Sequence, residues 1–435
     1  MSAQTITLGC RLNFAESEAM RGLAGDDVII VNSCAVTNEA VRQTRQAIRR
    51  AHRAAPEKRI IVTGCAAELD PEGFAGMPEV ARVVGNADKY FASSFSPIRH
   101  PGLDPGSTFP AVGVEERWAP GQARGDDRRI IRSDIMTSAV PPVAAGFLSR
   151  VRSFVAVQAG CDHRCTFCTI WQARGPSRSL PYAAVRDAVV RELAAGAREI
   201  VLTGVDITSY ACPEPGRREG SLGALCQRLL GELSGLKRLR LSSLDSIEID
   251  GALMELVAGE PRLLPHFHLS LQAGDDLMLK RMKRRHSRRD AIATVERLKA
   301  ARHDVTIGAD LIAGFPTESE EAALYSLALL DECDVIAAHV FPFSPRPNTP
   351  AARMPQVERE IVKARAARLR EAAAARRSLW LDGLVGTRQN VLIENKERGH
   401  SDGFAPVRIA GSSRGDIGAA RITGREGDQL IGIFE

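Results

Sequence analysis

The chain has 435 residues, too many for one ordinary hydrophobic core, so two or three domains are expected. Its residues are 44% hydrophobic and its net charge is +5, and no run approaches the roughly eighteen consecutive apolar residues of a membrane span. We therefore expect no membrane partner and, because the amino terminus carries no signal-peptide pattern, a cytoplasmic location. Nine cysteines in such a chain favour metal ligation over a disulfide framework.

Residues 1–98 alternate short apolar runs with helical patterns, which is typical of an open parallel α/β sheet. In such a sheet the carboxyl ends of the strands lie along one edge, where ligands bind. Strands are predicted over residues 5–8, 28–31 and 59–63, and each is followed by a cysteine, respectively Cys10, Cys34 and Cys65. We predict that these thiols converge on an iron-sulfur cluster; the alternative is three buried structural cysteines.

Residues 99–149 are rich in Pro, Gly and Arg and show little periodicity before the short run IIRSDIM. Such a composition cannot bury enough apolar surface to become ordered. We therefore expect a largely disordered linker between two domains, from which residues 100–127 can be removed without loss of activity.

A second group of cysteines lies in one short loop, GCDHRCTFC. Its C-x3-C-x2-C spacing supplies three thiolates, Cys161, Cys165 and Cys168, and a four-iron cluster held by three thiolates keeps one iron open. A zinc site is the alternative, with His163 as the fourth ligand that zinc prefers.

The segments TLGCRLNFAESEAM, VNSCAVTNEA and TGCAAE resemble the methylthiotransferases of the radical S-adenosylmethionine superfamily. The later segments GVDITSY, LRLSSLDSIEID, HLSLQAGDD, LKRMKRRHSR, ADLIAGFPTE and HVFPFSPRPNTPA resemble the subgroup that acts on N6-threonylcarbamoyladenosine in tRNA. Arg11 departs from the family pattern, in which lysine is common, as do Trp171 and Gln172, which replace a frequent Pro-Tyr pair.

Residues 150–379 carry six predicted strands with helical patterns between them, over 154–158, 199–203, 238–242, 266–271, 305–312 and 335–341. They resemble the incomplete (βα)6 barrel of radical S-adenosylmethionine enzymes, in which chemistry takes place at the carboxyl ends of the strands. Candidate cofactor-lining residues at or near those ends, together with the aromatic inside the cysteine loop, are Phe167, Gly204, Asp206, Ser242, Ser243, Gln272 and Asp310.

Basic residues are concentrated in two places. Residues 280–290 hold seven Lys or Arg against one Asp, a density that favours contact with nucleic acid over a solvated helix face. The candidates are Arg281, Lys283, Arg284 and Arg285. Residues 353–377, of helical composition, hold eight basic and three acidic residues, and here a solvated face is equally expected.

Residues 380–435 contain short β-like runs and glycines, which predict a small antiparallel β-barrel. This segment resembles the TRAM-like RNA-binding domain that ends many tRNA-modifying enzymes. It has seven basic and eight acidic residues, so RNA contact has to use local groups. The candidates are Arg388, Lys396, Arg398 and Phe404.

The resemblance implies an enzyme that attaches a methylthio group to carbon 2 of N6-threonylcarbamoyladenosine at tRNA position 37. It implies two 4Fe–4S clusters, S-adenosylmethionine, tRNA and an external low-potential electron donor, with no DNA partner. Isopentenyladenosine in tRNA and a ribosomal-protein aspartate are alternative substrates. A non-catalytic, metal-stabilised RNA-binding protein is the alternative of another class. Packing is the expected role of Cys212, Cys226 and Cys333.

Overall fold

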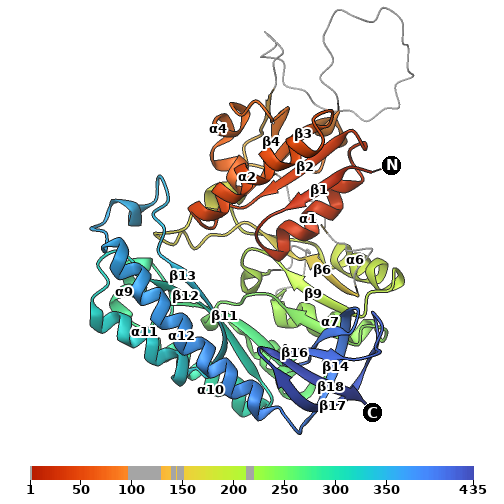
Figure 1. The fold of residues 1–435 in the computed structure, drawn as a ribbon, viewed down its shortest axis with the longest axis vertical. Helices are drawn as coiled ribbons and strands as arrows, with labels where there is room; N and C mark the ends of the chain where they lie inside the picture. Colours follow the sequence, from red (N-terminus) through yellow and green to blue (C-terminus); the bar gives the residue numbers. More distant parts are fainter. Residues whose placement is uncertain (1, 97–128, 139–143, 145–150, 212–219) are drawn as a thin grey trace, which may run out of the picture.

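The computed structural model describes residues 2–96, 129–138, 144, 151–211 and 220–435. The chain folds into three parts, an amino-terminal α/β domain, a central curved sheet covered by helices, and a small carboxy-terminal barrel (Figure 1). The predicted fold class is confirmed in all three parts. Cys212 and residues 97–128, most of the expected linker, lie outside the described residues.

The amino-terminal domain is a five-stranded parallel sheet whose strands lie side by side in chain order. Every residue of the sequence VIIVNS in its second strand is buried, because helices cover both faces of a parallel sheet. The strands are β1 (Gln4–Thr7), β2 (Val28–Ser33), β3 (Arg59–Gly64), β4 (Arg82–Val84) and β5 (Ile130–Ile131). The helical segments are α1 (Arg11–Arg21), α2 (Asn38–Ala54), α3 (Cys65–Leu69), α4 (Pro71–Ala75) and η1 (Ala92–Phe95).

Two strands of this sheet were not predicted. β5 lies within the stretch expected to be a disordered linker, where it pairs in parallel with β4. Arg132 donates to the buried Glu68 carboxylate at 2.6 Å, and the Ser133 hydroxyl donates to Asp88 at 2.6 Å. Residues 129–138 therefore belong to the amino-terminal domain, which corrects the linker expectation for this segment.

The central domain contains the six predicted strands, all parallel, in two three-stranded sheets. Parallel bridges from Leu239 to Leu263 and from Leu244 to Leu269 join the two sheets into one incomplete barrel. Its strands are β6 (Arg152–Ala156), β9 (Glu199–Thr203), β10 (Leu239–Leu241), β11 (His266–Gln272), β12 (Thr306–Ala313) and β13 (Val335–Pro342). A small hairpin, β7 (Gln158–Ala159) with β8 (Arg178–Ser179), follows the first strand.

Helices cover the outside of this incomplete barrel, and their apolar faces pack on the strands to form the largest hydrophobic core of the described residues. The helices in this core are α6 (Tyr182–Ala194), α7 (Leu222–Glu232), α8 (Gly251–Gly259), α10 (Arg288–Ala301), α11 (Glu320–Glu332) and α12 (Arg359–Gly383). Helix α9 (Asp276–Met282) packs in a smaller core, and α5 (Ile170–Arg174) packs against the amino-terminal domain. Short 3-10 turns are η2 (Ile207–Ser209), η3 (Ser246–Glu248) and η4 (Pro350–Arg353). No described helix combines the length and the apolar character needed to cross a bilayer.

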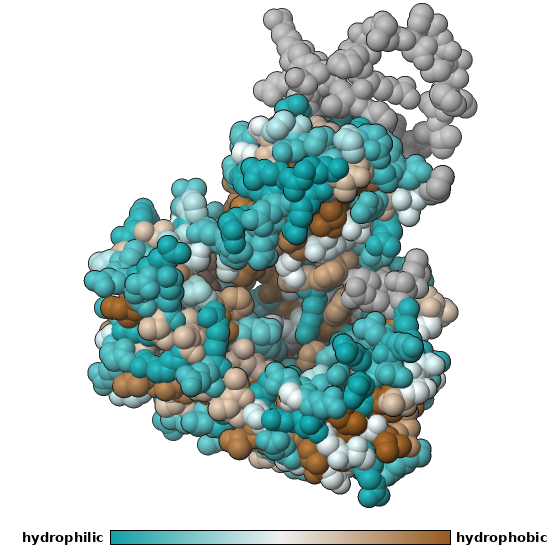
Figure 2. Space-filling model, viewed as in Figure 1, coloured by the Kyte–Doolittle hydropathy of each residue, from teal (hydrophilic) through white to brown (hydrophobic). Residues whose placement is uncertain are grey.

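The amino-terminal domain lies across the open side of the incomplete barrel. Leu12 and Ala15 of α1 pack with Ala156 of the edge strand β6. Asn38, at the start of α2, accepts a hydrogen bond from Arg346, which follows the other edge strand β13, at 2.7 Å. Figure 2 shows the molecule hollowed between this domain and the two parts below it.

The carboxy-terminal domain is a closed five-stranded barrel with the order β14–β15–β16–β18–β17. All its strand pairs are antiparallel except β16 with β18, which are parallel. The prediction of a small antiparallel barrel is therefore correct apart from this pair. The barrel docks on the amino-terminal ends of the central strands, where Arg238 pairs with Asp402 and Thr306 donates to the Gly403 carbonyl at 2.9 Å. The strands are β14 (Arg388–Asn395), β15 (Arg398–Ser401), β16 (Pro406–Ile409), β17 (Ile417–Glu426) and β18 (Gln429–Phe434).

Candidate active site

Three cysteines converge at the carboxyl edge of the amino-terminal sheet. Cys10 is the residue before α1, Cys34 follows β2 directly, and Cys65 begins α3 directly after β3. Gly9 brings two of these loops together: its φ is +95°, and a Cβ there would lie 2.7 Å from the Cys34 sulfur. The three residues lie close together: after burial and other neighbours, the charge of Cys65 contributes to raising the pKa of Cys10 and of Cys34, and the charge of Cys10 contributes to raising the pKa of Cys34. We call them the amino-terminal triad.

Cys161, Cys165 and Cys168, the loop triad, lie between β7 and α5. Backbone groups hold the loop: the Thr166 N–H donates to the Met282 carbonyl at 3.1 Å, and the Cys168 N–H donates to the Cys165 carbonyl at 3.1 Å. Arg284 donates toward the Cys165 sulfur at 3.7 Å. A cation at this position would offset the negative charge of a metal cluster held by the loop.

Burial dominates the acid–base behaviour of the thiols. It raises the pKa of Cys34, Cys161 and Cys168 to about 12, and it raises the pKa of Cys10. Neutral buried thiols become thiolates when a metal binds, because coordination releases the proton. Both triads therefore have donors suited to an iron-sulfur cluster.

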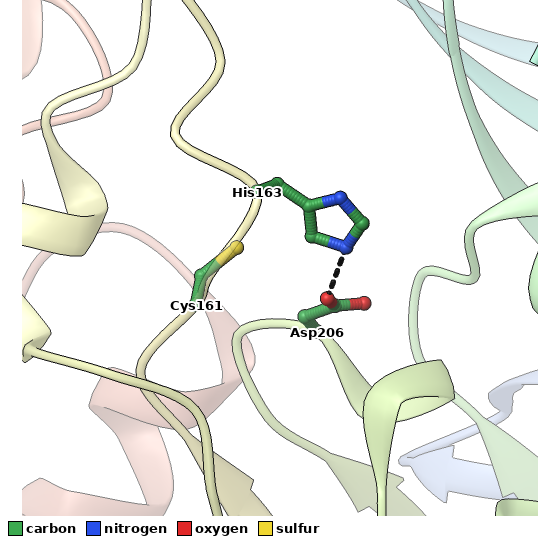
Figure 3. A group of neighbouring side chains, drawn as sticks. All are labelled: Cys161, His163 and Asp206. Atoms are coloured by element: carbon green, nitrogen blue, oxygen red, sulfur yellow. Dashed lines mark ion pairs between the residues drawn. The ribbon is translucent and has the colours of Figure 1, made fainter. Parts of the chain in front are cut away.

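His163 does not complete a set of four ligands with the loop triad. Its Nε2 lies 2.5 Å from Oδ2 of Asp206, and Figure 3 shows the imidazole turned to that carboxylate. The hydrogen bond to Asp206 raises the pKa of His163. The ligand atoms of Cys161, His163 and Asp206 lie within 4.8 Å of one another, whereas Cys165 and Cys168 are not part of that group. The arrangement does not favour a Cys3His zinc site.

The two triads face each other across the contact between domains. Arg174, the last residue of α5, donates from Nε to the Cys65 sulfur at 3.1 Å. The same guanidinium donates to Glu16 at 2.7 Å and to the Asn13 side-chain oxygen at 2.6 Å. Charge on Cys65 reaches Cys168 as well, so the two groups of sulfur atoms share one electrostatic environment.

A cavity of about 180 Å³ opens beside the triads. The Cys34 loop contributes Val36 and Thr37 to its wall. The central domain contributes three of the predicted cofactor-lining residues, Phe167, Gln272 and Asp310. Further lining residues are Ile312, Phe341, Pro342, Phe343, Ser344 and Arg346.

The other candidate cofactor-lining residues lie outside this cavity wall. Asp206 is beside Cys161, and Gly204 allows close approach of the Gln158 carbonyl oxygen, which a Cβ would meet at 2.7 Å. Ser242 is buried at the end of β10 and Ser243 is exposed.

The candidate RNA-binding residues fall into two groups. Lys283, Arg285, Arg388, Lys396 and Arg398 are exposed, although Arg285 pairs with Glu248 and Arg388 pairs with Glu435. Three others are turned toward the protein, namely Arg281, Arg284 and Phe404. The Arg284 side chain is 7% exposed and pairs with Asp245 at 2.9 Å.

Phe404 lies where the carboxy-terminal barrel meets the central strands. Its ring stacks on His400 at 4.6 Å and on His266 at 5.1 Å between ring centroids. Arg240 lies over the same ring at 4.8 Å. We therefore assign Phe404 to the contact between domains, because both ring faces have protein neighbours and are not free to stack on a base.

Sequence reasoning missed Arg174, Glu16 and Arg346, which surround the thiols. Glu16 lies within the segment TLGCRLNFAESEAM, whose family resemblance does not distinguish Glu16 from the residues around it. Only the docking of the domains shows that Arg174 and Arg346 approach the amino-terminal triad.

The chain matches the model of the Radical SAM superfamily over residues 155–330 and that of uncharacterized protein family UPF0004 over residues 2–85. A threonylcarbamoyladenosine tRNA methylthiotransferase MtaB from Rickettsia prowazekii is 40% identical over 412 residues, covering 93% of this chain and 91% of that protein. The MtaB protein of Aquifex aeolicus is 30% identical, covering 93% and 96%.

A relative with a different enzyme name, the tRNA-2-methylthio-N(6)-dimethylallyladenosine synthase of Sorangium cellulosum, is 30% identical, covering 98% of this chain and 88% of that protein. Among solved structures, the radical S-adenosylmethionine methyltransferase TsrM from Kitasatospora setae is similar at a TM-score of 0.49 and 16% identity, covering 78% of this chain and 67% of that one. With two thiol triads and relatives matched over nearly their full length, the chain belongs to the radical S-adenosylmethionine methylthiotransferase family that includes the MtaB enzymes.

Proposed function

We propose that this enzyme attaches a methylthio group to carbon 2 of N6-threonylcarbamoyladenosine at position 37 of tRNA. The observation that carries the proposal is the pairing of two cysteine triads across one contact, beside one cavity. The MtaB relatives, at up to 40% identity, support the choice of nucleoside. A substrate of this kind also accounts for a cytoplasmic location, where tRNA is modified.

The loop triad would hold a 4Fe–4S cluster, and the amino-terminal triad would hold a second one that carries sulfur. A three-thiolate cluster leaves one iron open for S-adenosylmethionine, which supplies a 5′-deoxyadenosyl radical for a C–H bond that no acid or base activates. Arg284 and Arg174 each place a guanidinium on a sulfur of one triad, where it would offset the negative charge of a bound cluster.

The cavity residues Phe167, Gln272 and Asp310 would position the adenine and the cofactor. On the Cys161 side, Gly204, Asp206, Ser242 and Ser243 remain our candidates for contacts with S-adenosylmethionine. Arg281, Lys283, Arg285, Arg388, Lys396 and Arg398 are our candidates for the tRNA backbone, and an unpaired anticodon-loop base suits entry into a cavity. The reaction needs an external low-potential electron donor, and we expect neither DNA nor a membrane as a partner.

The test is nucleoside mass spectrometry of tRNA from a deletion strain that expresses the wild type, Cys65→Ala, Cys168→Ala or Cys333→Ala. Cys333 is a buried thiol outside both triads and serves as the matched control. We expect the methylthio nucleoside with the wild type and Cys333→Ala only. Purified Cys65→Ala should still cleave S-adenosylmethionine to 5′-deoxyadenosine, and Cys168→Ala should not.

Anaerobic metal analysis should give about eight irons per wild-type chain and about four in either triad variant. A methylthio group on isopentenyladenosine, or on a ribosomal-protein aspartate, would instead identify one of the alternative substrates. Zinc in place of iron, with no cleavage of S-adenosylmethionine, would contradict the proposal.

A further inference from the structure

Arg11 opens α1 directly after Cys10, and its side chain reaches the place where the amino-terminal domain meets the incomplete barrel. Among the described residues, no hydrogen bond and no ion pair reaches its guanidinium. Its recorded contact is with the Phe404 ring, 6.0 Å from the guanidinium carbon. Arg11 is partly exposed, so an anion from outside the chain can reach this guanidinium and pair with it.

The carboxylates within electrostatic reach of Arg11 are Glu199 and Asp310, and both are already engaged. Glu199 accepts hydrogen bonds from Arg152, Arg238 and Arg240. Asp310 shares Oδ1 between two imidazoles, at 2.9 Å from His268 and 3.1 Å from His339. Neither is left to neutralise Arg11.

Other cations gather at the same place. The guanidinium carbons of Arg152 and Arg240 lie 5.2 and 4.8 Å from the centroid of the Phe404 ring that Arg11 also faces. The like charges of Arg152 and Arg240 beside Arg11 make the electrostatic potential at this place favourable for a negative ligand.

The position connects this cation to the cavity. Asp310 lines the cavity beside the triads and lies within electrostatic reach of Arg11. Arg11 also keeps some exposure to solvent, so a ligand in the interior can reach it. In the chain, Arg11 directly follows Cys10 of the amino-terminal triad.

We propose that Arg11 binds the carboxylate of the threonylcarbamoyl group on the substrate nucleoside. This rests on the proposed function. The threonylcarbamoyl group ends in a carboxylate, which the planar guanidinium fork fits with two parallel hydrogen bonds. An isopentenyl group has no charge and would leave the guanidinium unpaired, so Arg11 determines specificity between the two adenosines.

The test measures the binding of anticodon stem-loop RNAs to the holoenzyme with both clusters, by fluorescence anisotropy. One RNA carries N6-threonylcarbamoyladenosine at position 37, and the other carries its methyl ester, which keeps the shape and removes the charge. We expect the wild type to bind the acid roughly 10- to 100-fold more tightly than the ester. Arg11→Met should bind both alike, and Arg11→Lys should recover part of the preference.

Arg186→Met is the control, since the side chain of this arginine on α6 is 41% exposed, pairs with Asp187 and does not line the cavity, so its loss should leave the acid-to-ester ratio unchanged. Iron content and melting temperature equal to the wild type establish that Arg11→Met is folded and loaded. If it is not, Arg11→Gln and Arg11→Lys are compared by the same ratio, which does not depend on the fraction of active protein.

Equal binding of acid and ester by the wild type would overturn the inference. If Arg11→Met weakened both RNAs by one factor, the guanidinium would contact a phosphate instead, which also overturns it. A turnover assay separates failure of this inference from failure of the proposed function. If the wild type methylthiolates the threonylcarbamoyl RNA and Arg11→Met still prefers the acid over the ester, only the inference about Arg11 is refuted. No turnover of that RNA by the wild type refutes the proposed function.

Discussion

The Arg174 guanidinium hydrogen-bonds with three different side chains near the sulfur atoms. It is buried and donates to Cys65, Asn13 and Glu16, and Glu16 in turn pairs with Lys89 at 2.7 Å. Each of these buried polar groups has lost its hydrogen bonds to water, so the hydrogen bonds and ion pairs among them have to offset that desolvation cost. The network joins α5 of the central domain to α1 of the amino-terminal domain.

Arg174→Met should therefore destabilise the protein strongly, by about 3–5 kcal/mol, because it leaves the Glu16 carboxylate with one partner fewer in a buried site. We also expect loss of iron from the amino-terminal triad with the loop cluster retained. Urea unfolding and iron analysis measure the two effects. Arg186→Met is the matched control, since the side chain of that arginine is 41% exposed and pairs with Asp187 on the surface; equal free energies of unfolding for the two variants would contradict the prediction.

Glu16 should make stability depend on pH. Burial alone would raise its pKa, but Arg174 and Lys89 lower the pKa to about 2 from an ordinary 4.5. A carboxyl with a depressed pKa stabilises the fold above its unfolded value and loses that contribution as the pH falls toward the folded value. The stabilisation is of order 3 kcal/mol at neutral pH.

Accordingly, the stability difference between the wild type and Glu16→Gln should be full above pH 5 and shrink between about pH 4.5 and 2. Urea unfolding of both proteins without their clusters gives this difference, so that loss of iron in acid does not contribute. A difference that stays constant over this range would show that the carboxyl is not held charged by its neighbours.

At the scale of single elements, the loop that carries Cys161 depends on a glycine. Gly160 has φ +77°, and a Cβ there would lie 1.8 Å from the Pro176 carbonyl oxygen. Strands β7 and β8 meet at this point, so neither backbone can give way without opening the hairpin. The loop triad is therefore fixed by a close approach of two backbones.

Gly160→Ala should remove the loop cluster and lower the melting temperature by several degrees. Gly196→Ala is the control: that glycine has φ +99° but nothing within 4 Å of its Cβ position, so only backbone strain of about 1 kcal/mol applies. Iron content and melting curves compare the two variants. Full iron in Gly160→Ala would disprove the role of the close approach.

The sequence could predict those features that depend on residues near one another in the chain. The runs at 28–31 and 59–63 predicted strands because a buried parallel strand is a continuous apolar segment, and the cysteines at their ends followed from that order. β4 and β5 have only three and two residues, too short for such a pattern. Arg11 and Arg174 act through contacts between domains, which no local pattern contains.

At the scale of the whole molecule, the positions of Ser96 and Arg129 show how short a connection between η1 and β5 can be. Its two ends lie together, since Arg82 donates to the Ser96 carbonyl at 2.9 Å and the Val83 N–H donates to the Arg129 carbonyl at 2.6 Å. A connection of a few residues can therefore replace residues 97–128, which lie outside the described part of the chain.

Deletion of residues 100–127 should leave activity and iron content unchanged. Each halving of a flexible loop lowers its closure cost by about 0.6 kcal/mol, so stability should stay equal or rise by up to about 2 kcal/mol. Methylthiolation assays and urea unfolding measure both. A soluble, fully loaded but inactive deletion variant would assign this segment a role in the reaction.

Helix α5 sets the spacing between the loop triad and Arg174. It begins two residues after Cys168 and ends at Arg174, whose side chain touches the Cys65 sulfur. Five residues of helix rise about 7.5 Å, and a helix neither stretches nor bends over that distance. Helix α5 thus fixes the spacing between the loop triad and Arg174, and the hydrogen bond from Arg174 to the Cys65 sulfur carries that spacing across the domain contact to the amino-terminal triad.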